Sequence, residues 1–156
     1  ANDVIYRYLQ NGLFEPKPSV ATVSNAMDVG NPSNFIRILQ IFKHQVPQLK
    51  RVISAASIDD ETTKQTIAHV YKRYNYILDP HGAVAYKALE DYFTKNEGKG
   101  FILETAHPVK FPDVVEEAIG KKVEVPDSAK DLFLQEKHSI KIPASFDVVK
   151  EWLMYR

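Results

Sequence analysis

The chain has 156 residues, of which 44% are apolar, and its 20 basic and 20 acidic residues cancel to a formal net charge of zero. This composition predicts one globular domain with a real core, and it provides no basic surplus for nucleic acid. The absence of cysteine excludes disulfides, cysteine zinc sites and thiol catalysis. Without a membrane-length apolar run or a signal-peptide pattern, we expect a cytoplasmic protein that binds neither membrane nor nucleic acid.

The first third of the chain contains two helix signals separated by a loop. Residues 2–11 are expected to form a helix that ends at Gly12. An irregular stretch then leads to Pro32, which is placed to open a second helix, and Pro47 breaks that helix. The apolar face of the second helix repeats every three or four residues, at Phe35, Ile38, Leu39 and Phe42.

Two longer helices are predicted in the middle of the chain. Ser57 to Asp60 provide the start signals of the first, whose acidic beginning and basic end suit the helix dipole. Its expected buried stripe is Thr63, Thr66, Ile67, Val70, Tyr71 and Tyr74. Asp79 and Pro80 open the second helix. The side of that helix expected to pack is Ala85, Ala88, Leu89, Tyr92 and Phe93.

A short apolar run, Phe101 to Leu103, predicts a buried strand over residues 101–105. Ligands bind at the carboxyl ends of strands in open α/β sheets, and this strand would end at a hydroxyl residue, Thr105. Helices are expected near 112–119, 128–134 and 145–154, and short extended pieces near 123–125 and 140–142. These patterns predict a strongly helix-rich α/β fold with one to three short strands.

Generic searches for chemistry find little. The five histidines lack metal-ligand spacing with carboxylates, and no nucleophile elbow or phosphate-binding glycine loop occurs. The acidic cluster from Asp59 to Glu61 is interpreted as a helix cap. Taken alone, these residues support only a helix-rich α/β domain.

Three longer runs, in a fixed order, carry a family resemblance. They are Ser24 to Val29 with Pro32 to Phe35 behind it, then Asp79 to Tyr86, then Glu104 to Phe111. Together they resemble the carboxyl-terminal part of threonine synthase, a pyridoxal-phosphate enzyme of fold type II, the tryptophan-synthase-β type. The resemblance runs from Asn2 to near the carboxyl terminus and is weakest after Lys121.

The resemblance implies that residues 1–156 form a single carboxyl-terminal segment of a larger enzyme. Residues 2–31 would lie at the edge of the pyridoxal-phosphate-binding domain, 32–96 would form a helical part, and 97–156 would form the strand and closing helices. Because the chain has no initiator Met, we interpret it as a truncated segment rather than as a small natural protein. The strand would then belong to a larger parallel sheet.

The activity implied for the full-length enzyme is the conversion of O-phospho-L-homoserine and water to L-threonine and phosphate. This is a carbon–oxygen lyase reaction of threonine biosynthesis that uses pyridoxal 5'-phosphate. In the family, the Schiff-base lysine and the phosphate-binding loop lie upstream of the matched segment, and no lysine here stands in a matching motif. We therefore expect no catalytic residue, no metal, no bound cofactor and no activity in this segment alone.

One cofactor-binding residue follows from the resemblance. Thr105, in the Thr-Ala-His-Pro run, matches the hydroxyl that faces the pyridine nitrogen of the cofactor. The alternative is a Thr that only caps the next helix. Relatives often carry Gly where this chain has Glu104, which puts the local backbone geometry in doubt. His107 and Lys110 are interpreted as structural, with His107 able to serve as a cap.

Three residues are candidates for the substrate side. His81 stands at a helix start, where polar groups meet anionic ligands, although a packing role is the alternative. Asn25 and Asp28 resemble a loop that lies toward the active-site cleft, and both residue types also favour turns through their own hydrogen bonds.

Two other functions remain open. One is a cofactor-independent helical interaction domain, which an upstream lysine and phosphate loop in the natural protein would exclude. The other is a related pyridoxal-phosphate-dependent serine or threonine lyase, against which the runs at 24–28 and 79–81 argue. A strand separated from its sheet leaves an apolar edge, so we expect residues 101–105 either to pair with a downstream segment or to lie in a contact between copies.

Overall fold

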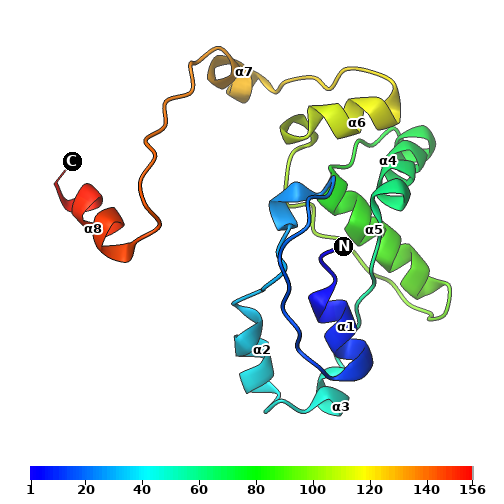
Figure 1. The fold of residues 1–156 in the computed structure, drawn as a ribbon. Coiled ribbons are helices and arrows are strands. Elements are labelled where there is room, and N and C mark those ends of the chain that lie inside the picture. The colour runs from blue at the N-terminus through cyan, green and yellow to red at the C-terminus, as the bar shows by residue number, and fades with distance from the viewer. Residues whose placement is uncertain (156) are drawn as a thin grey trace. The chain divides into compact units, whose positions relative to one another are not determined.

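The computed structural model describes residues 1–155, apart from the side chain of Phe133. The chain divides into two units, Ala1–Glu124 and Val125–Arg156, and each is described by itself. Within the described residues the secondary structure consists of eight α-helices and two short 3-10 helices (Figure 1).

The amino-terminal part of the first unit is built from α1 (Val4–Asn11), α2 (Phe35–Ile41) and α3 (Val46–Leu49). α1 ends at Gly12, whose φ of 80° is left-handed, as the sequence predicted. The loop between α1 and α2 contains the 3-10 helix η1 (Asn25–Met27). These helices share a core of Tyr8, Leu9, Phe35, Leu39 and Leu49.

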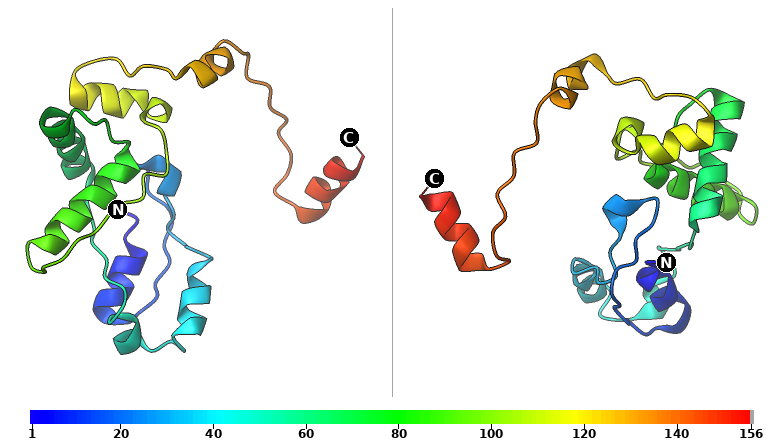
Figure 2. Two further views of the ribbon diagram at one scale, coloured as in Figure 1. Left: turned by 180° about the vertical axis from the view of Figure 1, so that it is seen from behind. Right: turned by 45° about the horizontal axis from the view of Figure 1, so that its top comes forward.

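The second part of the unit contains α4 (Asp60–Tyr74), α5 (Pro80–Phe93), η2 (Pro108–Lys110) and α6 (Pro112–Ile119). α4 packs against both α5 and α6, and the two further views show the same arrangement (Figure 2). Their common core is Ile67, Val70, Leu78, Ala83 and Val115.

Most of the predicted buried stripe of α4 is confirmed, because Thr63, Thr66, Ile67 and Val70 are buried. Asp59 caps this helix by accepting a hydrogen bond from the Thr62 N–H at 2.7 Å. Two aromatic residues were predicted wrongly: Tyr74 and, in α5, Tyr92 are exposed. Both lie close to the carboxyl ends of their helices, beyond the stretch in which α4 and α5 bury their facing residues.

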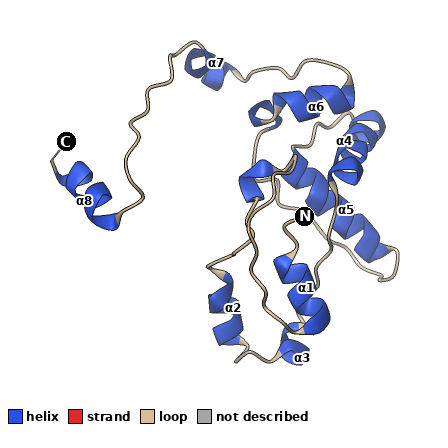
Figure 3. Ribbon diagram, viewed as in Figure 1, coloured by secondary structure: helices blue, strands red, loops and turns tan. Residues whose placement is uncertain are grey.

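The expected strand over residues 101–105 is absent. The described residues contain no strand (Figure 3), and residues 101–106 make no backbone hydrogen bond to any of them. A β-strand exists only through a neighbour that pairs with it, and the elements on either side of 101–105 are the helix α5 and the 3-10 helix η2. Ile102 packs against the core, whereas Phe101 and Leu103 are exposed.

The second unit contains α7 (Asp127–Phe133) and α8 (Phe146–Met154), each within one residue of its predicted start. The short extended pieces expected near 123–125 and 140–142 form no strand in the described residues. Nowhere in residues 1–155 is a helix both long and apolar enough to cross a membrane.

Candidate functional site

The start of α5 buries a charged cap. Asp79 is the N-cap residue, and its carboxylate accepts hydrogen bonds from the N–H groups of His81 at 2.9 Å and Gly82 at 3.3 Å. Pro80 occupies the first helical position, where no N–H is needed. Because the Asp79 side chain is wholly shielded from solvent, its charge depends on these donors and on the groups described next.

His81 packs beside this carboxylate. Its Nδ1 lies 2.5 Å from Oδ1 of Asp79, and its ring stacks at a tilt on Phe111 with 4.9 Å between ring centroids. The other ring nitrogen, Nε2, is buried and has no hydrogen-bond partner among residues 1–155. A buried polar atom of this kind normally has a partner, so Nε2 is an unsatisfied polar atom within this cluster of described residues.

Glu104 reaches the same cluster from the segment before η2. Its Oε1 accepts a hydrogen bond from the Asp79 N–H at 3.3 Å. Glu104 is exposed as a residue, but partial desolvation of its carboxyl group and the hydrogen bond with Asp79 raise the pKa of that group to about 7. Burial also opposes the charge of Asp79, but the hydrogen bonds from Glu104 and His81 outweigh it and lower the pKa of Asp79. Below pH 7, Glu104 therefore holds the proton and Asp79 holds the charge.

Thr105 follows Glu104 directly in the chain. It is exposed, and its hydroxyl makes no hydrogen bond to other described residues. The cap of η2 is made instead by His107, whose Nδ1 accepts from the Val109 N–H at 3.2 Å. The structure thus gives His107 the capping role that the sequence suggested and leaves the Thr105 hydroxyl available.

The two loop candidates differ in their surroundings. Asp28 accepts hydrogen bonds from the Thr22 hydroxyl at 2.6 Å, the Thr22 N–H at 2.9 Å and the Asn2 amide at 2.9 Å. These contacts tie the loop to the start of α1. Asn25, in η1, is exposed and lines a cavity.

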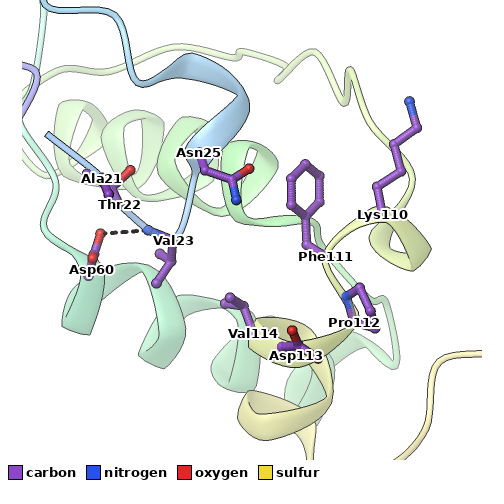
Figure 4. A pocket seen from close by; sticks show the side chains of 10 residues that line it. All are labelled: Ala21, Thr22, Val23, Asn25, Asp60, Lys110, Phe111, Pro112, Asp113 and Val114. Atoms are coloured by element: carbon purple, nitrogen blue, oxygen red, sulfur yellow. Dashed lines mark hydrogen bonds between the residues drawn. The ribbon is translucent and has the colours of Figure 1, made fainter. Parts of the chain in front are cut away.

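This cavity, of about 420 Å³, lies between the η1 loop, the start of α4 and the start of α6 (Figure 4). The Val23 N–H donates to the Asp60 carboxylate across one edge at 3.3 Å. Figure 4 shows the side chain of Lys110 extending away from the hollow. The lining residues are Ala21, Thr22, Val23, Asn25, Asp60, Lys110, Phe111, Pro112, Asp113 and Val114.

The structure therefore brings some of the predicted site residues together and leaves others apart. His81 and Thr105 are connected through Asp79 and Glu104, and Asn25 lines a cavity that shares Phe111 with His81. Asp28 holds its own loop. The sequence did not indicate that Glu104 and Asp79 would meet, since 25 residues separate them. The sequence did contain one relevant signal, which is that Glu104 stands before Thr105 where relatives often carry Gly.

Comparison with known sequences identifies relatives along nearly the whole chain. A family model described as "Threonine synthase, C-terminal" matches residues 82–153. Threonine synthase from Escherichia coli (strain K12) is 39% identical over 153 residues, which cover 98% of this chain and 35% of that protein. Threonine synthase from Serratia marcescens is 40% identical over 157 residues, with 99% and 35% covered.

Solved structures of threonine synthases also resemble this chain. The crystal structure of threonine synthase from Escherichia coli superposes with a TM-score of 0.84 at 38% identity, covering 99% of this chain and 35% of that one. A pyridoxal-phosphate-bound threonine synthase from Brucella melitensis superposes with a TM-score of 0.71 at 25% identity, covering 97% and 38%.

By its fold and its matches, this chain corresponds over nearly its whole length to the carboxyl-terminal segment of longer enzymes. These enzymes are the threonine synthases, and the chain spans about a third of the length of the relatives that it matches.

Proposed function

We propose that this chain supplies the carboxyl-terminal part of a threonine synthase of fold type II, which uses pyridoxal 5'-phosphate to convert O-phospho-L-homoserine and water to L-threonine and phosphate. The observation that carries the proposal is the match to threonine synthases over 98% of the chain. A cytoplasmic location is part of the same proposal. The segment alone is expected to be inactive, because the lysine and the phosphate loop of the family are expected upstream.

Two features of the structure fit a cofactor and substrate held by this chain together with the rest of the enzyme. The Thr105 hydroxyl is exposed and has no partner among the described residues. Nε2 of His81 is buried and also lacks one. His81 belongs to the network around Asp79, and Thr105 follows Glu104, another member of that network, in the chain.

Each of the candidate residues of this chain would then have a separate role in binding. Bound pyridoxal phosphate supplies the electron sink for the substrate carbanion. Thr105 would hold the ring nitrogen with a neutral hydroxyl, which leaves that nitrogen less protonated than a carboxylate would. His81, held through Nδ1 by Asp79, would fix the first turn of α5 on the substrate side, with its Nε2 enclosed by this chain. Asn25 would contribute its amide from the cavity, and Asp28 would keep the η1 loop in place.

The test of this proposal is Thr105→Val in the full-length enzyme. Val is close to Thr in shape but lacks the hydroxyl, so the ring nitrogen would lose its partner. Loss of such a hydrogen bond costs about 1–3 kcal/mol, which is roughly tenfold to a hundredfold in rate where the transition state feels it. Steady-state kinetics and the absorption spectrum of the bound cofactor measure the effect.

Thr105→Ser is the matched control, because it keeps the hydroxyl and should keep most of the activity. An unchanged rate and an unchanged cofactor spectrum in Thr105→Val would remove Thr105 from the site.

A further inference from the structure

The side chain of Glu104 bridges two parts of the chain that meet at the candidate site. Its backbone is continuous with Thr105, and its carboxyl group reaches back to the first turn of α5, where Oε1 accepts the Asp79 N–H at 3.3 Å. Through Asp79 the bridge extends to the His81 ring, because Nδ1 of His81 lies 2.5 Å from the same carboxylate.

The first turn of α5 has room for this carboxyl group only because residue 82 is glycine. A Cβ built on Gly82 would overlap both carboxyl oxygens of Glu104. The backbone of Gly82 is in the helix and does not have a positive φ, so its conformation does not require glycine. The close approach of Glu104 is therefore what distinguishes this position.

The segment that Glu104 ties down has little else to hold it. Residues 101–106 make no backbone hydrogen bond to other described residues, and Phe101, Leu103, Glu104 and Thr105 are exposed. Ile102 packs into the core on one side of Glu104, and His107 caps η2 on the other. The contact with Asp79 is thus the polar anchor nearest to the Thr105 backbone.

We propose that Glu104 is a positioning residue, whose carboxyl group binds the start of α5 over Gly82 and so sets the place of the Thr105 hydroxyl against the cofactor ring. The inference rests on the proposed function, since Thr105 is the group that is positioned. Glu104 and Gly82 depend on each other. The side chain of Glu104 reaches the first turn of α5, and the absence of a Cβ at Gly82 leaves space for its carboxyl group.

The experiment uses the full-length enzyme with Glu104→Ala, Glu104→Gln, Gly82→Ala and the double variant Gly82→Ala/Glu104→Ala. The readouts are the dissociation constant of pyridoxal phosphate for the apoenzyme, the absorption spectrum of the bound cofactor, and kcat and KM separately. Glu97→Ala is the control, because Glu97 is an exposed residue in the loop after α5. Circular dichroism and melting temperature report whether each variant is folded.

Glu104→Ala should bind the cofactor about tenfold more weakly, the size expected for one lost hydrogen bond, and should alter its absorption spectrum. Glu104→Gln should stay near wild type, because its amide both donates to the Asp79 carboxylate and accepts the Asp79 N–H. Gly82→Ala should reproduce the Glu104→Ala spectrum, since the new methyl displaces the carboxyl group. The double variant should be no worse than either single variant, which is the signature of one shared interaction.

Wild-type cofactor affinity and spectrum in folded Glu104→Ala, beside an impaired Thr105→Val, would overturn the inference and leave the proposed role of Thr105 intact. Additive losses in the double variant, or a Glu104→Gln as impaired as Glu104→Ala, would overturn it as well. An unimpaired Thr105→Val would instead refute the role of Thr105 itself. Should Glu104→Ala fail to fold, the comparison of Gly82→Ala with Glu104→Gln decides the question.

Discussion

At the scale of single residues, two carboxyl groups, those of Asp79 and Glu104, meet at the candidate site. Burial opposes the charge of Asp79, but hydrogen bonds from Glu104 and His81 lower its pKa, while the pKa of Glu104 is raised to about 7. A protonated Glu104 attracts the Asp79 carboxylate, and an ionised Glu104 repels it. The polar network therefore depends on pH near neutrality.

The stability of the 156-residue chain should show this dependence. The pKa of Glu104 is raised from 4.5 to about 7 on folding, so its contribution to the free energy of unfolding is complete below pH 4.5 and is lost as the pH rises to 7. Glu104→Gln cannot titrate and lacks that loss. Urea unfolding at intervals between pH 4.5 and 8 should therefore show the wild type losing stability relative to Glu104→Gln as the pH rises. A constant difference between the two would contradict the assignment of the proton to Glu104.

At the scale of elements, α4 is the helix that holds α5 and α6 together. Ile67 in α4 and Val115 in α6 are both fully buried in the core that these three helices share. Since the first turn of α5 carries Asp79 and His81, the packing of α4 also fixes the position of the candidate site.

Ile67→Ala should destabilise the chain by about 2–5 kcal/mol, because it leaves a cavity where three helices meet. Ile41→Ala, on the outer side of α2 with 73% of the residue exposed, should change the free energy of unfolding by less than about 0.5 kcal/mol. Urea unfolding followed by circular dichroism measures both. Equal effects of the two substitutions would mean that α4 does not organise this core.

At the scale of the whole molecule, the segment before η2 presents an apolar edge. Phe101 is 84% exposed and Leu103 is 71% exposed, on either side of the partly buried Ile102. Because no strand forms within the described residues, pairing with a downstream segment is not the way this edge is covered. The other expectation, a contact between copies of the isolated chain, stays a prediction.

The isolated chain should therefore self-associate. Its mass in size-exclusion chromatography with light scattering should rise above that of a monomer with concentration, since exposed apolar groups gain by leaving water. Replacing Phe101 and Leu103 together by Ser should lower that mass, whereas Val52→Ser, at an exposed position after α3, should not. A strict monomer at every concentration would show that this edge drives no association.

Several features of the fold follow from neighbouring residues and were predictable for that reason. The cap at Asp59, the left-handed end of α1 at Gly12 and the buried stripe from Thr63 to Val70 each depend on spacing within one helix. The strand at 101–105 failed because pairing depends on a partner elsewhere in the chain. The pairing of Asp79 with Glu104 could not be predicted for the same reason, since it joins residues 25 positions apart.

The sequence by itself determined the presence of most helices, the cap at Asp59 and the resemblance of three runs to threonine synthase, because helix signals and motifs are local. It misplaced the start of the second helix, which begins at Phe35 and not at Pro32. Only the tertiary structure decided which polar groups meet: it buried Asp79, brought Glu104 over Gly82, and left Nε2 of His81 and the hydroxyl of Thr105 without partners among the described residues. Burial and long-range contact set the pKa of a carboxyl group, and both depend on packing that no local run of residues specifies.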